Sequence, residues 1–191
     1  MLSLGFPKSG FFVEFGGTDG QTMSNTYFLE KSFGWRGIIA EPAVIWHKQL
    51  LQNRKCIIEK RAVWGVSGQE ILFNQTASAD LSTIDRFSGG DYHSLSREDG
   101  FRYMVQTVSL QDLLMQNNAP KIIDYLSIDT EGSEYEILKN FDFESYSFRV
   151  ITVEHNHTDN RELVKVLLTS NGYKRVHEAI SDFDDWYILS R

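Results

Sequence analysis

The sequence predicts an α/β fold of the Rossmann-like type, with a mostly parallel sheet and helices on both of its faces. Short apolar runs alternate with amphipathic segments along most of the 191 residues, and this alternation is typical of parallel sheets whose two faces are covered. A glycine cluster follows the first apolar run, at residues 16–20. The last two apolar runs are joined by a short polar connection. They must pair antiparallel, because a parallel crossover needs a dozen or more residues.

Seven apolar runs have the length and the flanking polar residues of strands. In chain order they cover residues 11–15, 37–41, 56–64, 122–129, 148–154, 173–177 and 186–190. We therefore expect a seven-stranded sheet in which one C-terminal strand is antiparallel. Apolar residues at helical spacing predict helices at residues 22–33, 44–52, 110–116 and 161–170.

Residues 65–109 do not fit the alternation, since they hold several glycines among many serines and aspartates. We interpret this region as an insertion, in which a hairpin of residues 69–74 and 101–107 encloses a mobile loop. Loops of that length inside a domain are frequently lids or binding loops. A chain of this size is long enough for one substantial core and short for two, so residues 1–191 are expected to form a single domain.

Charge and composition exclude several classes of protein. The net charge is −7, and the basic residues nearest to a cluster are scattered over a predicted helix and the next strand, at Lys48, Arg54, Lys55, Lys60 and Arg61. A nucleic-acid partner is not expected, because proteins that neutralise many phosphates present a dense basic face. No apolar run approaches the roughly 20 residues that cross a bilayer, so no membrane span is expected. The single cysteine, Cys56, and a start without the pattern of a secretory signal favour a reducing, cytoplasmic setting.

The turn after the first predicted strand combines an acid with glycines. Glu14 is followed by Gly16, Gly17 and Gly20, and a second acid, Glu41, stands at the end of the next strand. Glycine suits a strand-to-helix turn because it adopts positive φ and lets a ligand approach the backbone closely. A carboxylate in the position of Glu41 accepts hydrogen bonds from two adjacent ribose hydroxyls. The spacing predicts a nucleoside-binding site, although the glycines depart from the strict G-x-G-x-x-G order.

Three segments resemble methyltransferases of the FkbM family. They are residues 14–20, residues 34–42 and, above all, residues 125–138, where a hydrophobic strand runs into Asp129-Thr130-Glu131-Gly132-Ser133-Glu134 and an amphipathic helix. The resemblance extends from about residue 11 to the C-terminus. It implies a class I methyltransferase fold. A closing antiparallel strand also distinguishes this fold from the dehydrogenase type of Rossmann-like fold. The resemblance further implies S-adenosylmethionine as the cofactor and O-methylation of a sugar or natural-product hydroxyl, so the partner would be a small-molecule hydroxyl acceptor.

The resemblance also implies which residues contact the cofactor. Glu14 would orient the glycine turn and interact with the ammonium group of the ligand, and Glu41 would hold the ribose. Backbone at the end of the third strand would lie near the adenine. The full set of expected cofactor-binding residues is Glu14, Gly16, Gly17, Thr18, Asp19, Gly20, Glu41, Pro42, Ala62, Val63 and Asp129.

Polar residues follow the fourth and fifth predicted strands, whose carboxyl ends should meet at the ligand-binding edge of the sheet. The candidates for catalysis are Asp129, Glu131, Glu154, His155 and His157. Asp129, Glu154 and Asn156 form a candidate site for a divalent metal. Their oxygens suit magnesium, whereas an imidazole ligand would favour manganese or zinc. Without a metal, His155 or His157 could act as general base on the acceptor hydroxyl.

Other polar residues near these positions have structural explanations. Glu134 and Glu136 stand at the start of a predicted helix, where acids favour the helix dipole, and Ser133 with Glu136 fits a capping box. His93, in the inserted region, would reach the acceptor only if the loop closes.

Two other functions are weighed against the methyltransferase. A nicotinamide-dependent oxidoreductase would share the first turn and Glu41, but it should show a stricter glycine pattern and a parallel end to the sheet. A non-catalytic nucleoside-cofactor-binding module is the stronger alternative, because the chain lacks an obvious segment to cover an acceptor. The presence of Asp129, Glu131 and the polar residues 154–157 argues against it.

Overall fold

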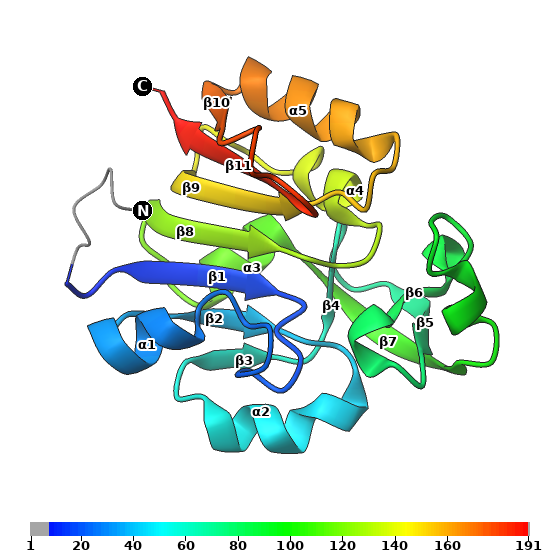
Figure 1. Cartoon of the computed structure of the whole chain (residues 1–191). Coiled ribbons are helices and arrows are strands. Elements are labelled where there is room, and N and C mark those ends of the chain that lie inside the picture. Colours follow the sequence, from blue (N-terminus) through cyan, green and yellow to red (C-terminus); the bar gives the residue numbers. More distant parts are fainter. Residues whose placement is uncertain (1–7, 191) are drawn as a thin grey trace.

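The computed structural model describes residues 8–190, and its centre is a seven-stranded sheet (Figure 1). From one edge to the other the strands run in the order β10-β11-β9-β8-β1-β2-β3. Their bounds are β1 Phe11–Phe15, β2 Arg36–Ala40, β3 Ile57–Glu59, β8 Ile122–Ile128, β9 Ser147–Glu154, β10 Tyr173–Val176 and β11 Asp184–Leu189. All neighbours pair in parallel except β11, which is antiparallel to both β9 and β10. The predicted sheet, with its one antiparallel C-terminal strand, is confirmed.

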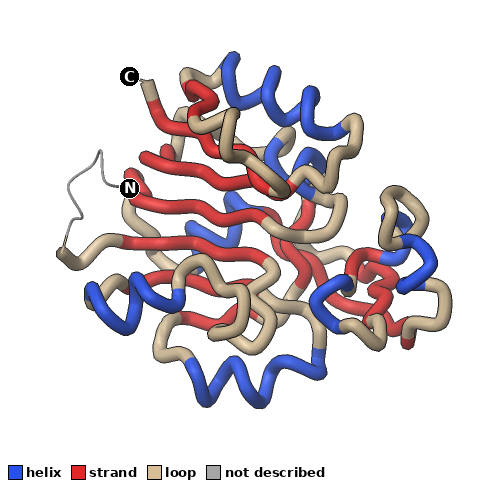
Figure 2. Tube along the Cα trace, in the orientation of Figure 1, coloured by secondary structure: helices blue, strands red, loops and turns tan. Residues whose placement is uncertain are grey.

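Helices cover both faces of this sheet, because successive side chains of a strand point to opposite sides. The helices are α1 Tyr27–Phe33, α2 His47–Asn53, α3 Leu110–Gln116, α4 Glu134–Leu138 and α5 Asn160–Ser170. In β1, Val13 and Phe15 belong to a core that also holds side chains of α3, α4 and α5. Phe12 points the other way, into a core with Leu29 of α1 and Leu50 of α2. Figure 2 shows these helices around the sheet. Within residues 8–190, no helix is both long and apolar enough to span a membrane.

A second, smaller sheet holds the inserted region. Its strands are β4 Ala62–Trp64, β5 Glu70–Gln75, β6 Thr83–Ile84 and β7 Phe101–Ser109, in the order β4-β7-β5-β6. Strands β5 and β7 pair antiparallel, with Phe73 opposite Tyr103. The chain between them, residues 76–100, contains β6 and several short 3-10 turns. Figure 1 shows this 76–100 segment beyond the end of the main sheet toward which β1, β8 and β9 point.

The prediction of one strand over residues 56–64 is wrong. The run breaks after Glu59, so that β3 lies at the edge of the main sheet while β4 pairs with β7 in the smaller one. The cause is Glu59 Oε1, which accepts the backbone N–H groups of Lys60 and Arg61 at 3.0 and 2.9 Å. A side chain that bonds the next N–H groups turns the chain and competes with a strand ladder. The break frees β4 to reach the carboxyl edge of the main sheet.

Candidate functional site

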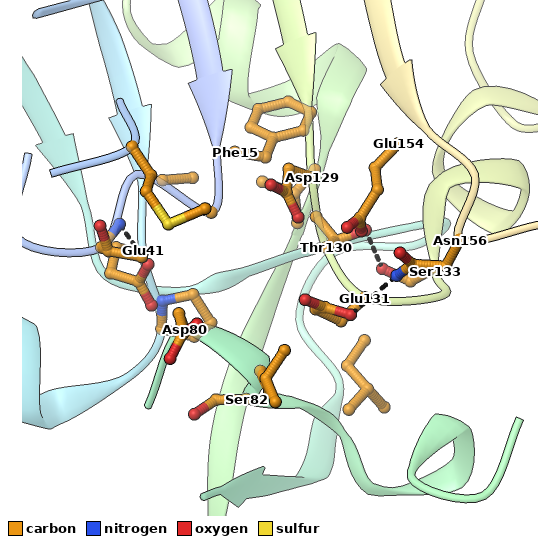
Figure 3. A pocket seen from close by; sticks show the side chains of 18 of the residues that line it. Phe15, Glu41, Asp80, Ser82, Asp129, Thr130, Glu131, Ser133, Glu154 and Asn156 are labelled. Carbon is orange, nitrogen blue, oxygen red and sulfur yellow. Dashed lines mark hydrogen bonds between the residues drawn. The ribbon is translucent and has the colours of Figure 1, made fainter. Parts of the chain in front are cut away.

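A cavity of about 490 Å³ opens at the carboxyl edge of the main sheet. Residues after β1, β2, β8 and β9 form one side of it, and residues of the 76–100 segment form the other. Figure 3 shows Asp129, Glu131 and Glu154 on the first side, with Asp80 and Ser82 across from them. The volume is that of small-molecule sites. Because open α/β sheets bind ligands at this edge, the cavity is the candidate functional site.

Gly16 closes the turn after β1 against the end of β8. Its φ is +75°, and a Cβ there would overlap the backbone oxygen of Asp129, so glycine alone fits without strain. Its N–H donates to the carbonyl of Ala40 at 3.1 Å, which joins the turn to β2. Gly16 and Thr18 both line the cavity.

Three other residues of this turn, all expected at the cofactor, have structural roles. A Cβ on Gly17 would lie 2.5 Å from Cγ2 of Ile39, and one on Gly20 would lie 2.6 Å from a leucine of α2. Asp19 Oδ1 accepts the N–H groups of the residues two and three positions further on, at 2.8 and 2.7 Å. None of the three is among the residues that line the cavity. The two glycines therefore allow close packing, and Asp19 stabilises the turn, but none of the three lies at the cavity wall.

Glu41, directly after β2, presents a carboxylate to the cavity. Its Oε2 accepts the N–H of Thr18 at 2.9 Å and its Oε1 accepts the N–H of Ala43 at 2.8 Å, so the backbone fixes the group. Burial raises the pKa of Glu41 to about 7, and the charges of Asp129 and Glu14 act in the same direction. A carboxylate oxygen has more than one lone pair, so Glu41 can still accept hydrogen bonds from a pair of ligand hydroxyls.

Glu14 lies behind the cavity wall. Its carboxylate accepts hydrogen bonds from the hydroxyls of Ser24 and Thr26 and from the N–H of Asn25 at 2.7 Å. Arg54 Nη1 lies 3.6 Å from Glu14 Oε2. These bonds hold residues 24–26 in a turn, which delays the start of α1 relative to the predicted helix. Glu14 is not among the residues that line the cavity, whereas Asn25 is, so the expected interaction of Glu14 with the ligand ammonium, direct or through water, stays a prediction.

The apolar part of the cavity forms where the two sheets meet. It contains Ala62 and Val63, which we expect near an adenine, and Pro42, which we expect at the cofactor. The inserted region adds further apolar surface from Phe73, Ala79 and Ile84. Apolar surface of this kind suits an aromatic base, because burial of apolar area stabilises the bound ligand.

Three carboxyl groups gather at the ends of β8 and β9. One oxygen from each of Asp129, Glu131 and Glu154 lies within 4.8 Å of the others. Burial raises the pKa of all three groups, and the neighbouring carboxylates raise those of Glu131 and Glu154 further. Glu154 Oε2 is buried and has no hydrogen-bond partner among the described residues. The group holds protons near neutral pH because its negative charges repel one another.

Arg97 holds the 76–100 segment onto this acidic group. Its guanidinium is fully buried and donates to Glu131 Oε2 and Asp91 Oδ1, each at 2.7 Å, and to the carbonyl of Leu81 at 2.8 Å. Asn156 Nδ2 donates to the same Glu131 oxygen at 2.9 Å. Sequence reasoning missed Arg97, because nothing in the sequence separates it from the other arginines of the insertion.

The histidines expected as general bases do not line the cavity. His155 is buried, with Nε2 3.8 Å from Asp185 Oδ1, and its Nδ1 accepts the N–H of His157 at 3.1 Å. His157 is exposed, with a φ of +54°. The chain turns after Glu154, where Asn156 and His157 both have positive φ, and neither histidine is among the residues that line the cavity. His93 lines it instead, with its ring centroid 3.9 Å from that of the neighbouring tyrosine.

The family model described as the methyltransferase FkbM domain matches residues 14–181. The chain belongs to the FkbM methyltransferase family. The match includes the glycine turn, Glu41 and the acidic residues after β8 and β9, all of which the structure places at one edge of the sheet. Membership supports an enzyme of the methyltransferase class.

Solved structures bear on the fold of this FkbM domain. A methyltransferase FkbM from Methylobacillus flagellatus matches with a TM-score of 0.56 and 13% identity, over 95% of this chain and 44% of that chain. This chain therefore spans less than half the length of that protein. Two further structures are less similar. A precorrin-6y C5,15-methyltransferase from Geobacter metallireducens has a TM-score of 0.46 and 10% identity, over 98% of this chain and 84% of that chain. A fibrillarin pre-rRNA processing protein from Methanococcus jannaschii has a TM-score of 0.46 and 13% identity, over 97% of this chain and 68% of that chain. The predicted class I methyltransferase fold is confirmed. No curated protein matches the chain in sequence.

Glu134 closes the loop that carries the acidic residues of the FkbM domain. Its Oε1 accepts the N–H groups of Thr130 and Gly132, each at 3.0 Å, and the hydroxyl of Thr130 at 2.8 Å. The predicted capping box of Ser133 with Glu136 is wrong, because the Ser133 hydroxyl donates to Thr130 Oγ1 at 2.8 Å and caps no N–H of α4. Glu134 thereby fixes the backbone on which Glu131 stands.

The raised pKa of Glu41 predicts how stability of the FkbM domain depends on pH. Its pKa is about 7 in the folded chain against an ordinary value of 4.5. Between these values the folded state holds more protons than the unfolded state, so this group makes the free energy of unfolding fall as pH rises. Urea unfolding at about pH 5 and about pH 7.5 should show that the free energy of unfolding falls more between these pH values for the wild type than for Glu41→Gln. Equal slopes in the two proteins would contradict the prediction.

Proposed function

We propose that the chain is an S-adenosylmethionine-dependent O-methyltransferase acting on a hydroxyl of a sugar or natural-product small molecule. The observation that carries the proposal is the convergence of Gly16, Glu41 and Asp129, from three strand ends, on one cavity. Gly16 would let the backbone approach the cofactor closely, and Glu41 would accept hydrogen bonds from its hydroxyls. Asp129 would be the partner for its positive charge.

The residues around the cavity fit the cofactor part by part. Glu41 would accept hydrogen bonds from the two ribose hydroxyls. The methionine portion would lie beside Gly16 and Asp129, which both line the cavity. The apolar wall for the adenine would come from Pro42, Ala62 and Val63. When bound, S-adenosylmethionine supplies a methyl group carried on a positively charged sulfur.

We assign the acceptor proton to the paired carboxyls of Asp129 and Glu154. Burial raises the pKa of Asp129 to about 7 and that of Glu154 further, so Asp129 is the member of the pair that can be ionised near neutral pH and accept the proton. Both side chains line the cavity that the acceptor hydroxyl would enter. Glu131, fixed by Arg97 and Asn156, would position that hydroxyl, and such alignment can supply much of the rate.

The test begins with isothermal titration calorimetry of S-adenosylmethionine and, separately, of NAD. Binding of the first and not the second supports the proposal over a nicotinamide-dependent oxidoreductase. Release of S-adenosylhomocysteine in the presence of hydroxylated acceptors then separates an enzyme from a non-catalytic cofactor-binding module. Tight NAD binding without S-adenosylmethionine binding would contradict the proposal.

The acidic group fits a divalent metal in donor type, since three carboxylates are hard ligands. The surrounding cation and amide argue against a required metal. Arg97 already brings a positive charge to Glu131, and Asn156 presents its amide nitrogen, not its oxygen, to the same carboxylate. We propose that Asp129, Glu154 and Asn156 act without a bound ion.

Dialysis against EDTA should therefore leave the affinity for S-adenosylmethionine and the thermal midpoint unchanged. Adding magnesium or manganese chloride to the dialysed protein should not raise that midpoint, because an ion that does not bind the folded protein does not stabilise it. A rise in the midpoint that disappears in Glu154→Gln would establish a metal site.

We also propose that the whole chain acts as one domain in a cytoplasmic setting. The 65–109 region supports the first point, because its segment 76–100 shares a cavity with the main sheet. Cys56 supports the second, since it is a free thiol whose pKa is raised by burial to about 12, and such a thiol is unreactive.

A further inference from the structure

The part of the cavity beside β11 is acidic in a way that the sheet itself does not explain. We call it the acceptor end and define it by the lining residues Tyr92, Glu131, Glu154, Phe183 and Asp184. Asp184 lies directly opposite Glu154 in the antiparallel pairing of β11 with β9. Like charges at directly opposed positions destabilise a sheet. Burial raises the pKa of both Glu154 and Asp184, and a cation bound beside them would favour their ionised forms.

The carboxyl groups of the acceptor end have no free counter-charge among the described residues that line the cavity. Among the described residues that line the cavity, none is a lysine or an arginine. The guanidinium of Arg97 is fully buried and already bound to Asp91 and Glu131. Arg161 and Arg175 contact Asp185 at 2.8 and 2.7 Å, and Asp185 is not a lining residue. An anionic group entering here would meet carboxylates without a cation to balance it.

Aromatic rings complete the acceptor end. Tyr92 is 58% exposed and Phe183 is 49% exposed, although both are large and line the cavity. Aromatic faces attract ammonium groups, and carboxylates bind them through charge-assisted hydrogen bonds. Both kinds of surface therefore favour the same ligand chemistry.

We propose that the acceptor end selects hydroxyl compounds by charge: it binds an acceptor that carries a protonated amine near the reacting hydroxyl, tolerates a neutral one, and excludes phosphorylated and carboxylated ones. This inference rests on the proposed function, since it concerns the acceptor of the same methyl transfer. Its determinants are Glu154 and Asp184, with Tyr92 as the ring that covers the amine.

The experiment uses cofactor analogues whose binding does not depend on knowing the acceptor. In each analogue a nitrogen replaces the sulfur of S-adenosylmethionine, and a three-atom arm ending in an amine, a hydroxyl or a carboxylate replaces the methyl group. The cofactor portion anchors each analogue, and the arm enters the acceptor end. Dissociation constants are measured by calorimetry in buffer that contains EDTA, for the wild type, Asp184→Asn and Glu162→Gln. Glu162 lies on α5 with its side chain 67% exposed and is the matched control.

The amine arm should bind at least about tenfold more tightly than the carboxylate arm, with the hydroxyl arm between them. Asp184→Asn should reduce that ratio about threefold or more, and Glu162→Gln should leave the ratio unchanged. Equal or tighter binding of the carboxylate arm by the wild type would overturn the inference alone, and so would an unchanged ratio in folded Asp184→Asn. Failure of S-adenosylmethionine itself to bind would overturn the proposed function, and this inference with it. If Asp184→Asn does not fold, the order of the three arms in the wild type decides.

Discussion

Replacement of Glu41 by alanine should lower the affinity for S-adenosylmethionine by roughly a hundredfold or more. A hydrogen bond to a charged group contributes about 1.5–3 kcal/mol, and two ribose hydroxyls would each lose one. Since 1.4 kcal/mol corresponds to a factor of about ten, two lost bonds exceed a factor of about a hundred. Alanine also releases the N–H groups of Thr18 and Ala43 that the carboxylate holds, which loosens the turn beside the cofactor. Calorimetry with the purified variant measures the effect.

Two further variants separate cofactor binding from folding. Glu41→Gln keeps the side-chain volume and one carbonyl oxygen, so its affinity should fall between those of the wild type and of alanine. Glu70→Ala removes an exposed glutamate at the start of β5, outside the cavity, and should bind the cofactor normally. Thermal unfolding shows whether each variant is folded. A folded Glu41→Ala protein with wild-type affinity would remove Glu41 from the cofactor site.

The fold is predictable from the sequence where local signals decide the structure. Helix α3 forms over the predicted residues, because Ser109 Oγ accepts the N–H of Asp112 at 3.1 Å and caps it, and such a cap is visible in the sequence. The 56–64 run fails because the competing bonds of Glu59 are made within two residues and leave no trace in the hydrophobic pattern. Periodicity reports which residues are apolar, and it does not report where a polar side chain turns the backbone.

Some residues of the candidate site can likewise be predicted from the sequence, and others cannot. Glu41 and Asp129 can be found because each ends a buried strand, and strand ends of a parallel sheet share an edge. The place of Arg97 depends on how the 76–100 segment folds back onto Glu131, 34 positions away in the chain, and no short-range pattern encodes that. Glu14 and His155 also end or follow strands, but turns specific to this chain direct them toward residues 24–26 and toward Asp185.

Replacement of Gly16 by alanine should destabilise the protein by about 2–5 kcal/mol and abolish cofactor binding. A left-handed backbone conformation costs a residue with a Cβ about 1–2 kcal/mol. The new methyl would also overlap the backbone oxygen of Asp129, so the ends of β1 and β8 would have to separate, and overpacking of this kind costs about 1–3 kcal/mol more. Urea unfolding measures the stability, and calorimetry on the folded fraction measures cofactor binding.

Gly68 offers a matched control for the backbone part of this effect. Its φ of +78° is close to that of Gly16, but a Cβ there would have no heavy atom within 4 Å. Gly68→Ala should therefore lose only about 1–2 kcal/mol and bind the cofactor normally. The difference between the two variants isolates the contact between Gly16 and Asp129 from the cost of positive φ. Equal losses would show that Asp129 can withdraw from the turn, and the cavity would then not depend on the close approach of β1 to β8.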